Sequence, residues 1–212
     1  RADGGSHGTS VAGLIVGQGQ FAGFAPGATL FSASAFARDR GSPAADVDRI
    51  GGALDFMARN RVNVVNMSFA GPSNAVLAEI LGEASRSMLL VAAMGNSGRS
   101  GALWPAASQH VMAVTAVDAS RRGYRRATTG AHVEVAAPGV DVWVATERGG
   151  GGYVSGTSYA APIVTSFAAR LLATGKDRGS VRRALGQTAQ DLGPAGRDTR
   201  FGFGLAVAPS CK

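Results

Sequence analysis

The residue best suited to act as a nucleophile is Ser158, within the stretch 156–162 of sequence Gly-Thr-Ser-Tyr-Ala-Ala-Pro. An apolar run follows this stretch, so the pattern predicts a turn that leads into a buried helix, with Ser158 in its first turn. Free backbone N–H groups and the positive end of the helix dipole favour negative charge there. The chain around Ser158 would therefore stabilise an oxyanion. Taken alone, however, the stretch is better explained as an ordinary capped helix after a glycine-rich loop.

Two other stretches contain the partners that a serine nucleophile needs. Residues 6–15 read Ser-His-Gly-Thr-Ser-Val-Ala-Gly-Leu-Ile, with His7 at a predicted helix start, and residues 92–98 read Ala-Ala-Met-Gly-Asn-Ser-Gly, with Asn96 after an apolar strand. An imidazole can remove the proton of a hydroxyl, and a carboxamide can donate a hydrogen bond to an oxyanion. A lone His is more often structural, and Gly-Asn-Ser-Gly is also ordinary turn chemistry. Catalytic roles are favoured only because all three stretches occur together.

Together the three stretches resemble the motifs of the subtilisin-like serine proteases, the subtilases. In that family the motifs are His-Gly-Thr-x-Val-Ala-Gly, Ala-Gly-Asn and Gly-Thr-Ser-x-Ala-x-Pro, and the matching stretches occur here in the family's order. The resemblance extends from about Asp3 to Leu205. It implies a serine endopeptidase with Ser158 as nucleophile and His7 as general base. It also implies an oxyanion hole formed by the Asn96 side chain and the Ser158 backbone N–H.

The resemblance predicts a catalytic Asp that this sequence does not supply. In the family it lies in an Asp-(Thr/Ser)-Gly motif at the end of a central strand, a few tens of residues before the His, but only six residues precede His7. Asp3 lacks that motif and corresponds instead to an acidic residue of the substrate cleft. We therefore expect residues 1–212 to form one subtilase catalytic domain that is incomplete at its N-terminus. Its partner would be a missing N-terminal segment that supplies the Asp, unless the enzyme is a nicked two-chain form. Loss of the Asp should lower turnover about 10⁴-fold, so this chain alone is expected to be weakly active or inactive.

Substrate contacts are also implied by the resemblance. An extended peptide would bind as an added strand beside residues 68–70 and beside a second segment near 42–45. Leu103 would form the floor of the primary specificity pocket, where many relatives have glycine, and would disfavour large aromatic side chains before the scissile bond. The residues expected to contact substrate are Ser68, Phe69, Ala70, Gly95, Leu103, Gly156 and Thr157.

No metal or cofactor is expected. A calcium-binding insertion is common near the His helix of the family. Here residues 17–23, Gly-Gln-Gly-Gln-Phe-Ala-Gly, are short and contain no carboxylate. Calcium takes several oxygen ligands, usually including carboxylates.

Alternating strands and helices must position these residues. Besides the helices at His7 and Ser158, periodicity predicts helices over 45–59, 74–85 and 178–188. Short apolar runs predict strands over 28–35, 62–67, 88–93, 111–117, 133–136 and 142–145. We interpret the glycine run 149–152 as a loop. The pattern indicates an α/β fold of three layers, with a mainly parallel central sheet and helices on both faces. Ser68 and Asn96 directly follow strand ends, where such sheets bind ligands.

Composition agrees with one folded domain. Hydrophobic residues make up 45% of 212 and charged residues 17%, which argues against disorder. No apolar run reaches the length of a membrane span, so membrane insertion is not expected. The net charge of +7 comes from scattered Arg residues, and only Arg121, Arg122, Arg125 and Arg126 cluster, in an expected exposed loop. Nucleic acid is therefore not an expected partner. The single Cys211 indicates no compartment; the family resemblance implies a secreted or cell-envelope location.

Two alternatives stay open from the sequence. One is a non-catalytic, subtilase-like domain that binds peptides without cutting them. The other is a basic protein that binds polyanions. A fluorophosphonate probe distinguishes the first alternative, because only an activated Ser158 reacts with it, and salt-dependent binding to nucleic acid would support the second.

Overall fold

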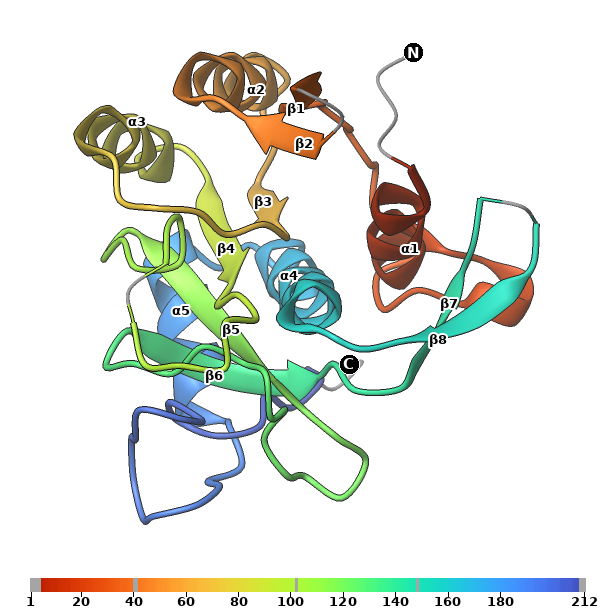
Figure 1. Cartoon of the computed structure of the whole chain (residues 1–212), viewed down its shortest axis with the longest axis vertical. Helices are drawn as coiled ribbons and strands as arrows, with labels where there is room; N and C mark the ends of the chain where they lie inside the picture. The colour runs from red at the N-terminus through yellow and green to blue at the C-terminus, as the bar shows by residue number, and fades with distance from the viewer. Residues whose placement is uncertain (1–4, 40–41, 102, 148, 210–212) are drawn as a thin grey trace.

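The computed structural model describes residues 5–39, 42–101, 103–147 and 149–209. Its centre is a parallel sheet of four strands (Figure 1), hydrogen bonded in the order β3 (Val64–Met67), β4 (Leu89–Ala93), β5 (Val111–Val117) and β6 (Val133–Pro138). Every residue of β4 and β5 is buried, because helices cover both faces of the sheet. The predicted α/β fold is confirmed.

Two helical layers cover this sheet. The helices are α2 (Val47–Arg59), α3 (Ala75–Ser85), α4 (Thr157–Leu172) and α5 (Arg178–Gln187). Side chains of α4 and α5 share one core with Val91 of β4, whereas side chains of α2 and α3 share the other core with Leu90. Because successive side chains of a strand point to opposite faces, the continuous apolar sequence of β4 supplies both cores.

Three of these helices begin at residues whose side chains satisfy free backbone donors. Asp46, Asn74 and Asp177 each accept a hydrogen bond from the backbone N–H three residues later, at 2.7, 3.0 and 3.0 Å. Such N-caps stabilise the first turn of a helix. The start of α3 at Asn74, predicted from the sequence, is confirmed.

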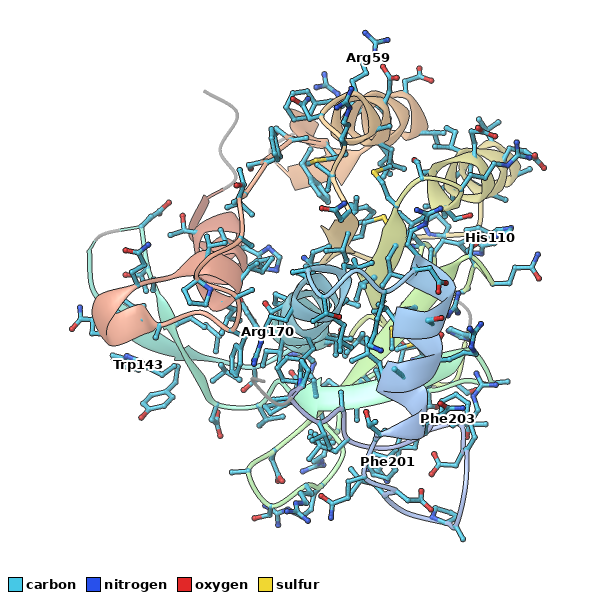
Figure 2. All side chains as sticks on the ribbon, turned by 180° about the vertical axis from the view of Figure 1, so that it is seen from behind. Arg59, His110, Trp143, Arg170, Phe201 and Phe203 are labelled. Carbon is cyan, nitrogen blue, oxygen red and sulfur yellow. The ribbon has the colours of Figure 1, made fainter. Side chains whose placement is uncertain are left out.

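One helix packs against α4, and a hairpin packs on that helix. They are α1 (Gly5–Val16), β7 (Val142–Ala145) and β8 (Gly151–Val154). The two strands pair antiparallel, and the Ser10 hydroxyl of α1 donates a hydrogen bond to the Ala145 carbonyl oxygen at 2.8 Å. Trp143 projects from the outer side of the hairpin (Figure 2), where its ring contacts those of Phe21 and Tyr153. The hairpin therefore rests on α1 and leads directly into α4.

Three local predictions are wrong. Residues 28–35 form no ladder with any described residue, and pairing starts only at β1 (Phe36–Asp39), which is antiparallel to β2 (Ser42–Ala45). The glycine run 149–152 is not all loop, because its last two residues begin β8. The apolar periodicity of residues 74–85 also predicts that Val76 faces inward on the helix, but this side chain is 60% exposed. A strand needs a neighbour and a helical face needs a packing partner, and neither is specified by local pattern.

An ion pair fixes α5 on the sheet. The Arg182 guanidinium donates hydrogen bonds to both carboxylate oxygens of Glu134 in β6, with Nε–Oε1 and Nη2–Oε2 distances of 2.8 and 2.5 Å. It also donates to the carbonyl oxygens of Gln109 and Val111. Glu134 is buried, so its charge depends on this partner.

We expect Arg182→Leu to lower the free energy of unfolding by about 2–4 kcal/mol, because it leaves the Glu134 carboxylate buried without a partner. Urea denaturation followed by circular dichroism measures the change. Arg183→Leu, on an exposed position of the same helix, is the matched control and should stay within about 0.5 kcal/mol. A similarly small loss for Arg182→Leu would contradict the role given to the pair.

Candidate active site

Ser158 lies in the first turn of α4, which begins at Thr157. The turn before the helix is held by a hydrogen bond from the Gly156 N–H to the Gly139 carbonyl oxygen at 2.7 Å. Position 139 requires glycine, because a Cβ built there would lie 2.9 Å from the Gly156 carbonyl oxygen. The helix start predicted around Ser158 is therefore confirmed, and Ser158 itself is half-buried.

Asn96 is bound to the residue that precedes Ser158. Its side-chain oxygen accepts hydrogen bonds from both the backbone N–H and the hydroxyl of Thr157, each at 3.1 Å. The Thr157 hydroxyl in turn accepts the N–H of Gly95 at 3.1 Å. With its oxygen occupied, the amide keeps Nδ2 as a donor, and this atom lies 3.3 Å from a Cβ built on Gly156. The structure thus brings Asn96, Gly95, Gly156 and Thr157 together at the start of α4.

Ser68 holds Ser158 through two hydrogen bonds. The Ser158 hydroxyl donates to the Ser68 carbonyl oxygen at 3.2 Å, and the Ser68 hydroxyl donates to the Ser158 carbonyl oxygen at 2.8 Å. That carbonyl is free to accept because Pro162, four residues later in α4, has no N–H to donate. The segment after β3 and the first turn of α4 are therefore directly joined.

Two residues that the sequence did not point to support Ser68 from behind. The Asn66 side-chain N–H₂ donates to the Ser68 hydroxyl at 2.9 Å, and the Thr165 hydroxyl donates to the Asn66 side-chain oxygen at 3.1 Å. The signal in the sequence was Pro162, since a proline inside a helix frees a carbonyl that needs another donor. The identity of that donor depends on the tertiary fold.

His7 lies in α1, which packs against the helix that carries Ser158. Its ring contacts the ring of Tyr159, with centroids 5.6 Å apart and planes at 57°. Among the described residues, no hydrogen bond joins His7 to Ser158, and no carboxylate forms an ion pair with the imidazole. The His7 side chain is exposed, but desolvation of its ring against neighbouring groups lowers the pKa of His7 below its ordinary value. The imidazole is therefore neutral at neutral pH, the form that can accept a proton. Asp3 lies outside the described residues.

The expected pocket residues also lie near one another. A Cβ built on Gly95 would lie 2.6 Å from Leu103 Cδ1 and 3.1 Å from the Ala70 Cβ, so Leu103 occupies the space beside Gly95. Backbone hydrogen bonds between Gly71 and Trp104 hold the two segments side by side. The Phe69 ring packs edge-on against Phe36 at the start of β1, 5.3 Å between centroids.

In the described ranges, no group of three or more His, Cys, Asp or Glu side chains could hold a metal ion. None of the described helices is both long and apolar enough to cross a bilayer.

Comparisons with known proteins agree with these observations. The model of the Subtilase family, Peptidase_S8, matches residues 1–204. The chain is 33% identical over 206 residues to the thermophilic serine proteinase of Bacillus sp. strain AK1, covering 94% of this chain and 50% of that protein. It is 33% identical over 202 residues to subtilisin DY of Bacillus licheniformis, covering 90% of this chain and 73% of that protein. The chain thus spans about half the length of some relatives and most of others.

Two solved structures share the fold of this chain and are 28–29% identical to it in sequence. One is the prenylagaramide maturation protease PagA, with a TM-score of 0.86, 29% identity and coverage of 96% of this chain and 80% of that chain. The other is a mutant of the protease domain of PatA, with a TM-score of 0.85, 28% identity and coverage of 96% and 78%.

The Tyr159 ring is expected to control the pKa of His7. Tyr159→Ala would admit water to the imidazole, so the pKa of His7 should rise toward about 6.5. An NMR titration of the His7 ring protons measures it. Tyr153→Ala, at an exposed tyrosine of β8, is the control and should leave the pKa unchanged. Equal His7 pKa values in all three proteins would contradict this role.

The lowered pKa of His7 also makes the stability of the fold depend on pH. The unfolded chain binds a proton at His7 at higher pH than the folded chain does, so the free energy of unfolding should fall as pH drops below about 6.5. Tyr159→Ala should weaken that dependence in denaturation curves recorded at several pH values.

Proposed function

The chain belongs to the subtilase family, and we propose that it is a serine endopeptidase that hydrolyses peptide bonds through Ser158. In this proposal residues 1–212 form one catalytic domain. The observation that carries it is the pair of hydrogen bonds from Thr157 to the Asn96 side-chain oxygen, which leave an amide N–H donor beside the first turn of α4. An oxyanion at that point would meet two donors, the Asn96 amide and the Ser158 backbone N–H.

Catalysis would begin when the Ser158 hydroxyl turns from the Ser68 carbonyl oxygen toward His7. The imidazole removes the hydroxyl proton while the serine oxygen forms a bond to the scissile carbonyl carbon. The protonated imidazole then gives that proton to the leaving amine, and the peptide bond breaks. Water hydrolyses the acyl-enzyme by the same steps, with His7 again acting as base and then as acid.

The imidazole needs a partner for its other nitrogen, and we propose that a segment outside this sequence supplies a carboxylate there. Two observations support this. Within the described residues, β3 pairs only with β4, so its other edge has unpaired backbone groups. Residues 28–35 also form no ladder with any described residue. A strand inserted beside β3 would pair with this edge, and its carboxyl end would lie on the side of Ser68.

The substrate would be a peptide or protein bound beside Ser68, Phe69 and Ala70. Leu103 fills space next to Gly95, which supports a shallow specificity pocket that disfavours large aromatic side chains. A secreted or cell-envelope location is proposed because the relatives include a minor extracellular protease of Bacillus subtilis strain 168, 34% identical over 211 residues.

One observation favours a second candidate, a domain that binds peptides without cutting them. The Ser158 hydroxyl donates to a backbone carbonyl rather than to His7, and a hydroxyl held in this way is not activated. The two candidates differ in the reactivity of Ser158.

Labelling by a fluorophosphonate probe separates the candidates. We expect the 212-residue chain to label slowly and a longer gene product that includes the upstream Asp to label about 10⁴-fold faster, since the Asp orients the imidazole. In-gel fluorescence over time gives the rates, and Ser158→Ala in both forms is the control. Comparable rates for the two forms would refute the missing-segment proposal, and no labelling of either would favour the binding domain.

Thr157 is expected to act through Asn96. In whichever form of the protein reacts with the fluorophosphonate probe, Asn96→Ala should lower kcat by about 10²–10³-fold. This is the magnitude known for such a donor in subtilisin. Thr157→Val should lower kcat about tenfold, because the amide loses one of the two donors that orient it. A chromogenic peptide substrate measures both.

The double variant tests the coupling between them. If Thr157 acts only by orienting Asn96, the double variant should be no slower than Asn96→Ala alone. Thr157→Ser, which keeps the hydroxyl, should restore most of the activity. Fully additive losses would mean that Thr157 has a separate role.

A further inference from the structure

Three arginines next to the Asn96 segment lack acidic partners. We name them the basic rim: Arg99, Arg125 and Arg126. All three are exposed, and within the described part of the chain no carboxylate lies within ion-pair distance of their guanidinium groups. Some other exposed arginines do have such partners, as Arg122 does with Asp118 at 2.8 Å. The rim is therefore a local excess of positive charge.

Backbone hydrogen bonds tie the rim to the candidate site. The Gly98 N–H donates to the Arg126 carbonyl oxygen at 2.8 Å, and the Thr129 N–H donates to the Arg99 carbonyl oxygen at 3.2 Å. Thr128, the residue before Thr129, donates its N–H to the Gly95 carbonyl oxygen at 2.9 Å. Residues 125–129 thus run directly beside residues 95–99, and Arg126 is bonded to a residue only two positions from Asn96.

The rim is held on rigid backbone. The Thr128 hydroxyl bonds both the N–H and the hydroxyl of Ser97, at 3.2 and 2.9 Å. Ala127, between the arginine pair and Thr128, is buried. The three charged side chains therefore project from a backbone that hydrogen bonds hold in place, and an external anion would satisfy their charges.

We propose that the basic rim binds an acidic segment of the peptide that occupies the site. An arginine guanidinium pairs with a carboxylate through two parallel hydrogen bonds, and three such groups give both attraction at a distance and orientation on contact. The rim borders the segment that carries Asn96, so acidic side chains of a bound peptide reach it without a second binding event. The proposal deepens the proposed function, on which it rests for the identity of the site, but its test needs binding only.

The experiment uses the 212-residue chain with Ser158→Ala and two rhodamine-labelled peptides of about ten residues. The peptides differ only at three consecutive positions, Glu in one and Gln in the other. We expect the acidic peptide to bind about tenfold more tightly by fluorescence anisotropy at low salt. The difference should shrink to about twofold at roughly 0.5 M salt, because these charges are exposed.

Charge reversal at the rim tests its location. Arg125→Glu with Arg126→Glu should abolish the preference for the acidic peptide. Arg61→Glu with Lys176→Glu, at two exposed positions outside the rim, changes the net charge equally and should keep most of it. Thermal unfolding by circular dichroism confirms that both double variants are folded.

Three results would overturn the proposal: equal binding of the two peptides, equal loss in the two double variants, or tighter binding of a single-stranded oligonucleotide of matched charge. The protease proposal is tested independently of the basic rim. If the acidic peptide binds as expected but no form with Ser158 intact reacts with a fluorophosphonate, the rim is supported and catalysis is rejected. If peptides are cleaved without regard to charge, catalysis stands and the rim is rejected.

Discussion

The two hydrogen bonds from Thr157 to the Asn96 side chain join the elements on which the whole candidate site depends. They tie the first turn of α4 to the loop after β4, and the Gly95 N–H closes the link on the Thr157 hydroxyl. Thr157 is fully buried, so these bonds lie in a medium where an unmet donor would be costly. The direction in which the Asn96 amide donates is therefore set by the helix that carries Ser158, and these bonds hold nucleophile and donor in one arrangement.

A second set of polar contacts reaches the same turn from the opposite side. It runs from Thr165, in the middle of α4, through Asn66 to the Ser68 hydroxyl, and ends on the Ser158 carbonyl oxygen. Such hydroxyl and amide groups weaken an apolar core unless each has a partner, but when all are satisfied they fix one arrangement. This explains why a helix that is buried along most of its length carries polar residues at all, and why Ser158 is held by its backbone as well as by its side chain.

Elements that depend on local pattern could be predicted from the sequence. The bounds of β5 and β7 and the start of α3 at Asn74 follow from runs of apolar residues and from N-cap chemistry. The contact between Thr165 and Asn66 could not be predicted, because it joins positions 99 residues apart. The prediction of a strand over residues 28–35 was wrong for the opposite reason. Their pattern fits a strand, but a strand exists only when a neighbour supplies backbone donors and acceptors.

Within the described residues, one edge of β3 is unpaired and His7 has no carboxylate partner, and a single added segment would account for both. Desolvation alone lowers the pKa of His7, which makes the imidazole a weaker base than free histidine, while the Ser158 hydroxyl is already hydrogen bonded to Ser68. A hydrogen bond of this kind has a net worth of about 1 kcal/mol, so a modest gain in basicity would be enough to draw the hydroxyl away. A carboxylate against the second ring nitrogen would supply that gain, because it stabilises the imidazolium and opposes the effect of desolvation. The strand proposed beside β3 would end at the same edge of the sheet as Ser68. One added segment would thus satisfy the sheet edge and activate the base.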